Sequence, residues 1–331
     1  NTAVNMLLAV GSVLVLIVLG EAGLRAFYAF ENSRYGGLSE RLERSRKAEY
    51  VDRKEINMTG LVQPSRYEDV IYEPKPGIGG LFRGKPFRIS SAGLRDREYS
   101  RIKPPDTVRI VGLGDSVMFG WGVGQDEPYL EVLERRLNGL PGDPRRFETL
   151  NFAVPGYNTA MEVAVFEHKA LVYEPDLVVI QFVNNDTGVP LFMQKPKDEF
   201  SLRRLYVVEF VASYLDRLEG PEGKKLFGHR LRDIEGQEEK DEIMIQYSHM
   251  LGKKGFGRAM ARLAELTKER DIPVIIITGT LSNKQRAMVA DAAETHGFHI
   301  LHIGPYSDAW VKEHGIPDTR KARQKALWVS R

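Results

Sequence analysis

Five short apolar segments that alternate with helical patterns constrain the fold of this chain most strongly. The segments lie at 108–114, 147–154, 176–183, 273–279 and 298–304, and glycine, proline or polar residues bound them. Between them, apolar residues recur at helical spacing at 128–137, 160–172, 257–268 and 284–296. Short apolar strands joined through helices form a parallel sheet that helices cover on both faces. The sequence therefore predicts one main α/β domain with a five-stranded parallel sheet.

Composition narrows the classes of function. Lysine and arginine number 47 against 45 acidic residues, so the charge balance gives no reason to expect a nucleic-acid partner. The chain has no cysteine, which excludes disulfide bonds and thiolate metal sites but is compatible with either side of a membrane. Its 7 histidines show no metal-ligand spacing, and we expect no metal site.

The start of the chain predicts a membrane anchor within residues 1–30. Residues 3–20 carry no charged side chain, and as a helix they would be about 27 Å long, close to the thickness of the hydrocarbon core of a bilayer. Aromatic side chains at Phe27, Tyr28 and Phe30 suit the membrane interface. A cleaved signal peptide and a buried core helix are the alternatives. We expect one transmembrane helix in contact with lipid, followed by a juxtamembrane linker over 31–89.

Polar residues suited to acyl chemistry follow three of the predicted strands. Ser116 lies in "GLGDS" after the first strand, Gly156 in "NFAVPGYNT" after the second, and Asn185 in "QFVNNDTG" after the third. Because the carboxyl ends of parallel strands meet at one edge of a sheet, we expect these residues to lie together. Ser116 would be the nucleophile, and two backbone N–H groups with the Asn185 amide would form an oxyanion hole. An ordinary turn with Ser116 as a helix cap is the alternative.

These stretches, together with "SSAGLRDREY" at 90–99, resemble the SGNH/GDSL hydrolase superfamily and its membrane-anchored bacterial members. The resemblance covers 90–331, with an insertion at about 187–255. It implies a flavodoxin-like three-layer α/β/α sandwich that needs no cofactor. It also implies acyl transfer from an ester, often on a carbohydrate. Residue by residue, it assigns Ser116 as nucleophile and Gly156 and Asn185 to the oxyanion hole, with Asp115 and Asp186 in support.

The last sequence block departs from the pattern of these relatives. In "IPDTRKARQKALW", Asp318 keeps the aspartate, but Arg320 stands where the relatives carry the catalytic histidine. An arginine stays protonated and cannot accept the serine proton. Removing the catalytic histidine of a serine hydrolase lowers its rate by about six orders of magnitude. We therefore expect a catalytically inactive protein, with His314 as the one histidine that could substitute as base.

Two classes of function follow from these features. The first is an inactive subunit that packs against transmembrane subunits of a larger membrane complex. The second is a working acyl esterase or O-acyltransferase of the cell envelope that acts on carbohydrate esters, and a protein that binds acyl groups without turnover is a further alternative. The resemblance favours a periplasmic position for the globular domain, whereas the basic residues after the predicted span favour the cytoplasmic side.

Overall fold

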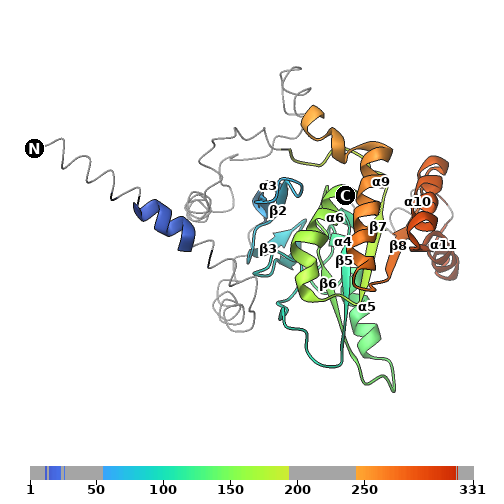
Figure 1. The fold of residues 1–331 in the computed structure, drawn as a ribbon. Coiled ribbons are helices and arrows are strands. Elements are labelled where there is room, and N and C mark those ends of the chain that lie inside the picture. Colours follow the sequence, from blue (N-terminus) through green and yellow to red (C-terminus); the bar gives the residue numbers. More distant parts are fainter. Residues whose placement is uncertain are drawn as a thin grey trace, which may run out of the picture.

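The computed structural model describes residues 12, 15–23, 26, 55–193, 244–317 and 319 (Figure 1). Residues 15–23 are helical. Within the described residues, no helix is long and apolar enough to cross a membrane. The span predicted over 3–20 falls largely outside the described residues, as do Asp318, Arg320 and most of the predicted insertion. The membrane anchor therefore stays a prediction.

A five-stranded parallel sheet forms the centre of the domain, in the order β6-β5-β7-β8-β9. The strands are β5 (Thr107–Leu113), β6 (Arg146–Asn151), β7 (Leu177–Phe182), β8 (Val274–Thr278) and β9 (His299–His302). Each falls within or next to one of the five apolar segments of the sequence. This strand order is the flavodoxin-like one, in which the chain reverses direction across the sheet beside the first strand. The predicted α/β fold with five parallel strands is confirmed.

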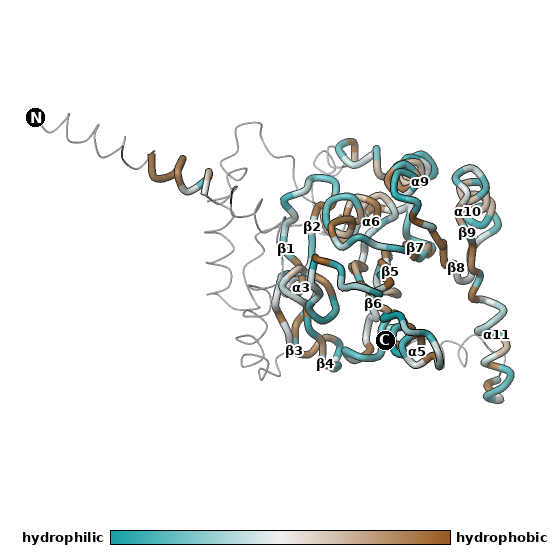
Figure 2. The backbone as a smooth tube through the Cα atoms, turned by 60° about the horizontal axis from the view of Figure 1, so that its bottom comes forward, coloured by the Kyte–Doolittle hydropathy of each residue, from teal (hydrophilic) through white to brown (hydrophobic). Residues whose placement is uncertain are grey.

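Helices cover both faces of the sheet (Figure 2). The helices of this part of the chain are α4 (Ser116–Phe119), α5 (Tyr129–Asn138), α6 (Thr159–Val165), α9 (Gly252–Lys268), α10 (Asn283–His296) and α11 (Gly304–Glu313). Helices α6, α9 and α10 lie on one face, where α9 packs against both of its neighbours, and α5 and α11 lie on the other. A π-helical turn (Phe166–Ala170) and a 3-10 turn (Leu171–Tyr173) extend α6, so the predicted helix over 160–172 is helical throughout.

Residues 55–89 belong to this domain, although the sequence pattern predicts a linker over 31–89. They form the short helix α3 (Met58–Leu61) and two antiparallel pairs, β1 (Val62–Pro64) with β2 (Tyr72–Pro74) and β3 (Gly79–Phe82) with β4 (Lys85–Arg88). Their side chains join the core; Leu61, Tyr72 and Phe87 are each fully buried. Strands of three or four residues are too short to show a period in the sequence, which explains the difference.

Candidate functional site

Ser116 lies at the carboxyl end of β5, where the strand turns into helix α4. The turn is built on Asp115, the N-cap residue, whose Oδ1 accepts a hydrogen bond from Val117 N at 2.9 Å. The helix ends at Gly120, which has a φ of 82° that favours glycine. The side chain of Ser116 is partly exposed, whereas Asp115 is buried. The sequence prediction that Ser116 follows the first strand on a tight turn is therefore correct.

Asp115 brings the side chains of Ser116 and Asn185 together. Ser116 Oγ donates to Asp115 Oδ2 at 3.2 Å, and Asn185 Nδ2 donates to the same oxygen at 3.2 Å. Asn185 comes from the turn after β7, and its side chain is exposed to solvent. Two of the three predicted blocks thus meet at one carboxylate.

Gly156 follows β6 in a conformation that only glycine adopts easily, with a φ of 81°. A Cβ at this position would lie 2.3 Å from Leu191 Cβ and 3.0 Å from the Tyr72 hydroxyl oxygen. Within the described residues, the N–H groups of Ser116 and Gly156 donate no hydrogen bond. Free backbone N–H groups are what an oxyanion hole requires.

Arg95 supports the segment that follows Ser116. Its side chain is 1% exposed, and its guanidinium donates to the carbonyl oxygens of Phe119 at 2.6 Å, Val123 at 2.6 Å and Gly124 at 3.2 Å, and also to that of Gly120. Arg95 therefore fixes the end of α4 and the loop beyond it. The sequence contained this residue in the "SSAGLRDREY" stretch, but no local pattern indicated which segment it would hold.

Two buried carboxyl groups, those of Asp186 and Glu162, interact with Asp115. Asp186 accepts a hydrogen bond from Val183 N at 2.9 Å through Oδ2, and Glu162 projects from the first turn of α6. Burial raises the pKa of each well above its ordinary value. The charges of Asp186 and Asp115 raise the pKa of Glu162 further, and the charge of Asp115 does the same for Asp186. Sequence reasoning missed Glu162. Its signal was a glutamate among the apolar residues of "TAMEVAV".

The histidines of the described residues lie elsewhere. None of these six histidines is hydrogen-bonded to Ser116. His314 Nδ1 lies 2.9 Å from the carbonyl oxygen of Trp310, on whose ring it stacks, and its side chain is exposed. His302 Nδ1 lies 2.5 Å from Thr278 Oγ1. A role of His314 as the base stays a prediction, as does the placement of Asp318 and Arg320.

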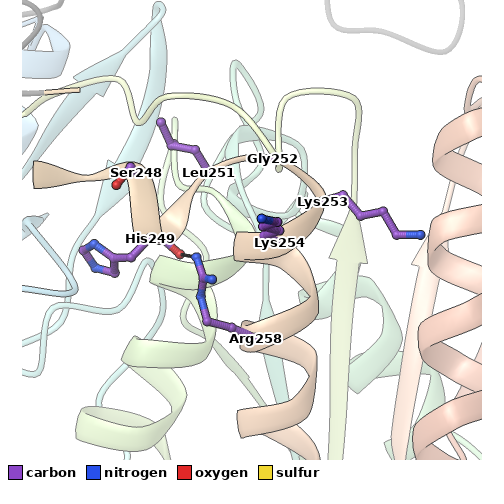
Figure 3. Close-up of a pocket in the computed structure, with 7 residues that line it drawn as sticks. All are labelled: Ser248, His249, Leu251, Gly252, Lys253, Lys254 and Arg258. Carbon is purple, nitrogen blue, oxygen red and sulfur yellow. Dashed lines mark hydrogen bonds between the residues drawn. The ribbon is translucent and has the colours of Figure 1, made fainter. Parts of the chain in front are cut away.

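A hollow of about 550 Å³ lies at the start of α9, apart from the residues around Ser116 (Figure 3). Its basic lining includes His249, Lys254 and Arg258, and Arg258 donates to the carbonyl oxygen of His249. Ser116, Gly156 and Asn185 are not among the residues that line it. Among the residues that the structure describes, no group of three or more His, Asp or Glu side chains is arranged to hold a metal ion.

Comparisons with known proteins agree with the GDSL pattern. The sequence model of the GDSL-like Lipase/Acylhydrolase family matches residues 113–319, which is more than half of the chain. No curated protein matches the chain.

Several solved structures are similar. They include a lipolytic protein of the G-D-S-L family from Desulfitobacterium hafniense DCB-2, with 12% identity, a TM-score of 0.34, and coverage of 59% of this chain and 77% of that one. A lipase/acylhydrolase from Enterococcus faecalis has 14% identity and a TM-score of 0.33, and the match covers 61% of this chain and 79% of that one. AlinE4, a SGNH-hydrolase family esterase, has 13% identity and a TM-score of 0.34, and the match covers 67% of this chain and 91% of that one. The family assignment rests on the match over 113–319, and on it the chain belongs to the GDSL-like Lipase/Acylhydrolase family.

Proposed function

We propose that this chain is a GDSL-family protein that does not hydrolyse esters and that serves as an accessory subunit of a membrane complex. One observation carries the first half of the proposal. The hydroxyl of Ser116 donates to the carboxylate of Asp115, and no imidazole among the described residues is hydrogen-bonded to it.

A serine needs a positioned general base to become a nucleophile. Asp115 already caps α4 through Val117 N and accepts from the Asn185 amide. The resemblance also aligns Arg320 with the histidine of the relatives, and an arginine cannot accept a proton. These features support a serine that is correctly placed but not activated.

The second half of the proposal rests on the sequence. The uncharged run over 3–20 has the length of a membrane-spanning helix, and small residues such as Ala9, Gly11 and Ser12 favour packing against other transmembrane helices. We place the globular domain in the periplasm, where envelope-acting relatives work.

A working acyl esterase or O-acyltransferase is the second candidate, because the donors predicted for an oxyanion hole are present. The N–H groups of Ser116 and Gly156 are free within the described residues, and the Asn185 amide lies beside the serine. With His314 as the base, hydrolysis would require this residue to leave its stacking contact with Trp310 and approach Ser116; another base is the alternative.

Labelling with a fluorophosphonate separates the two candidates. The full chain in detergent should show no labelling of Ser116 and no burst of product with an activated acyl ester, because the serine is not activated. The Ser116→Ala variant gives the background. Stoichiometric labelling that disappears in Ser116→Ala would make the protein an esterase.

Deletion of residues 1–54, which precede the first described residue of the domain, tests the accessory role. A tagged full-length chain, purified from detergent-solubilised membranes, should recover transmembrane partners that the truncated chain does not. If both chains recover the same partners, or if neither recovers any, the anchoring role is wrong.

A further inference from the structure

Glu162 is a buried acid without a partner. It is 1% exposed, and neither of its carboxyl oxygens has a hydrogen-bond partner among the described residues. Asp186 is also 1% exposed, and its Oδ1 lacks a partner in the same way. A fourth buried oxygen without a partner is the hydroxyl of Thr159, one turn before Glu162. Burying an unpaired ionised carboxylate costs far more free energy than burying a protonated one.

The groups that act on Glu162 make ionisation harder still. The charges that raise its pKa are those of Asp186 and Asp115, after burial itself. The hydroxyls of Tyr129, on α5, and Tyr157, after β6, also interact with Glu162; burial raises the pKa of both, so they remain neutral. Glu162 therefore faces acids and neutral hydroxyls, and a proton is the simplest neutralising group.

The same region joins helix α6 to the turn that carries Asn185. Thr159 N donates to the carbonyl oxygen of Asp186 at 3.0 Å, and Asn158 Nδ2 donates to that of Gly188 at 3.0 Å. Within the turn, Gly188 N donates to the carbonyl oxygen of Asn185 at 2.7 Å. The start of α6 and the 183–188 turn therefore form one hydrogen-bonded unit, with the unpartnered carboxyl oxygens buried in the same region.

We propose that Glu162 holds a proton where helix α6 meets the 183–188 turn, and that this proton keeps the Asn185 amide beside Ser116. If Glu162 lost its proton, its charge would be unpaired in the core and repelled by Asp186 and Asp115, and the turn would move away from α6. Glu162 is thus a positioning residue, which acts through Asp186 on Asn185. The proposal relies on the proposed function only for the role of Asn185 at the site, and its tests follow the proton and the turn without acyl chemistry.

The Glu162→Gln variant tests the proton, because glutamine resembles the protonated acid and cannot ionise. Glu148→Gln is the matched control: Glu148 is also buried, at 5% exposure, but its Oε2 accepts from Arg109 Nε at 2.9 Å. Infrared spectra should show that Glu162→Gln loses the carbonyl stretch of a protonated carboxyl group at neutral pH, whereas Glu148→Gln does not. If the band is the same in wild type and Glu162→Gln, the proposal is overturned.

The pH dependence of unfolding gives a second readout. An acid whose pKa in the folded state lies above its unfolded value of about 4.3 binds more protons when folded, so stability falls as the pH rises from that value toward the folded pKa. Relative to Glu162→Gln, the folding constant of the wild type should fall by up to about tenfold per pH unit over this range. The Glu148→Gln variant should gain no stability relative to the wild type as the pH rises, because it removes the partner of Arg109. Parallel pH profiles for wild type and Glu162→Gln would contradict the proposal.

Amide hydrogen exchange tests the link to Asn185. At alkaline pH, after correction for intrinsic rates, the N–H groups of Asp186 and Gly188 should exchange faster in the wild type than in Glu162→Gln. If Glu162→Gln does not fold, Asp186→Asn serves the same comparison, because it removes the charge that repels an ionised Glu162. Equal protection of the turn in wild type and variant would show that the proton does not position Asn185, whatever the protein does with esters.

Discussion

The hydroxyl of Ser116 and the carboxylate of Asp115 are hydrogen-bonded, with 3.2 Å between Oγ and Oδ2. The acid also caps helix α4 through Val117 N and accepts from the Asn185 amide. One side chain therefore fixes the start of the helix, the direction of the serine hydroxyl and the position of a predicted oxyanion donor. The first prediction concerns this carboxylate.

Replacing Asp115 separates its charge from its hydrogen bonds. Asp115→Ala should cost about 1–3 kcal/mol of unfolding free energy, because it removes the helix cap and two side-chain contacts. Asp115→Asn should cost less, since asparagine caps helices about as well as aspartate. Asp115→Asn should also lower the pKa of Glu162 and of Asp186, because the charge of Asp115 raises both. Urea unfolding at several pH values measures both effects. Equal losses in the two variants would show that the cap contributes little.

A second prediction concerns the last sequence block, where the resemblance aligns Arg320 with the catalytic histidine of the relatives. Arg320→His would supply an imidazole there, but by the same alignment Lys321, Ala322, Lys325 and Ala326 replace the Pro, Asn, Gly and His that would orient it. Because a catalytic group must be held in place as well as present, the variant should show no fluorophosphonate labelling above that of Ser116→Ala. Labelling that approaches one group per chain would mean that a single substitution removed the activity.

The sheet was predictable from the sequence because each strand overlaps an apolar segment with clear breaks on both sides. Helix α10 was predictable to within one residue, since Ser282 and Gly297 bound it with a capping box and a left-handed glycine. Other elements had no such signal. The pairs of strands between Val62 and Arg88 are too short for a period, and α11 buries only Val311 among its side chains.

Part of the site could also be read from the sequence. Ser116, Gly156 and Asn185 were predictable because each follows a strand, and parallel strands end at one edge of the sheet. The contact of Asn185 with Asp115, the partnerless state of Glu162 and the carbonyl contacts of Arg95 were not. They depend on which side chains meet after folding, and residues that are distant in the chain leave no local pattern of such contacts.

The third prediction concerns the space around Gly156. Gly156→Ala should destabilise the protein by about 2–4 kcal/mol, because alanine is strained at a positive φ and the new methyl group would overlap Leu191. The control is Gly257→Ala on α9, where nothing lies within 4 Å of the added carbon. That change should stabilise the protein by up to about 1 kcal/mol, since alanine favours helix. Thermal or urea unfolding of both variants measures the difference, and a neutral Gly156→Ala would mean that Leu191 moves aside freely.

The last prediction concerns Arg95, whose guanidinium donates to carbonyl oxygens at the end of α4 and in the loop that follows. Arg95→Met keeps much of the side-chain volume but removes every donor, and each buried carbonyl left without a partner costs about 1–3 kcal/mol. We expect a loss of at least about 3 kcal/mol in unfolding free energy. Arg95→Lys should also destabilise the protein, though less, because one ammonium group cannot reach all of the carbonyls that a planar guanidinium spans.

The exposed Arg136 provides the control for this prediction. Arg136→Met should change the unfolding free energy by less than about 0.5 kcal/mol. Hydrogen exchange should then show where the Arg95 variants loosen. The N–H groups of Gly120, Trp121 and Val123, which are hydrogen-bonded within this loop, should lose protection before those of the central strands. Uniform loss across the whole domain would instead make Arg95 a general core residue with no particular role in positioning the loop after Ser116.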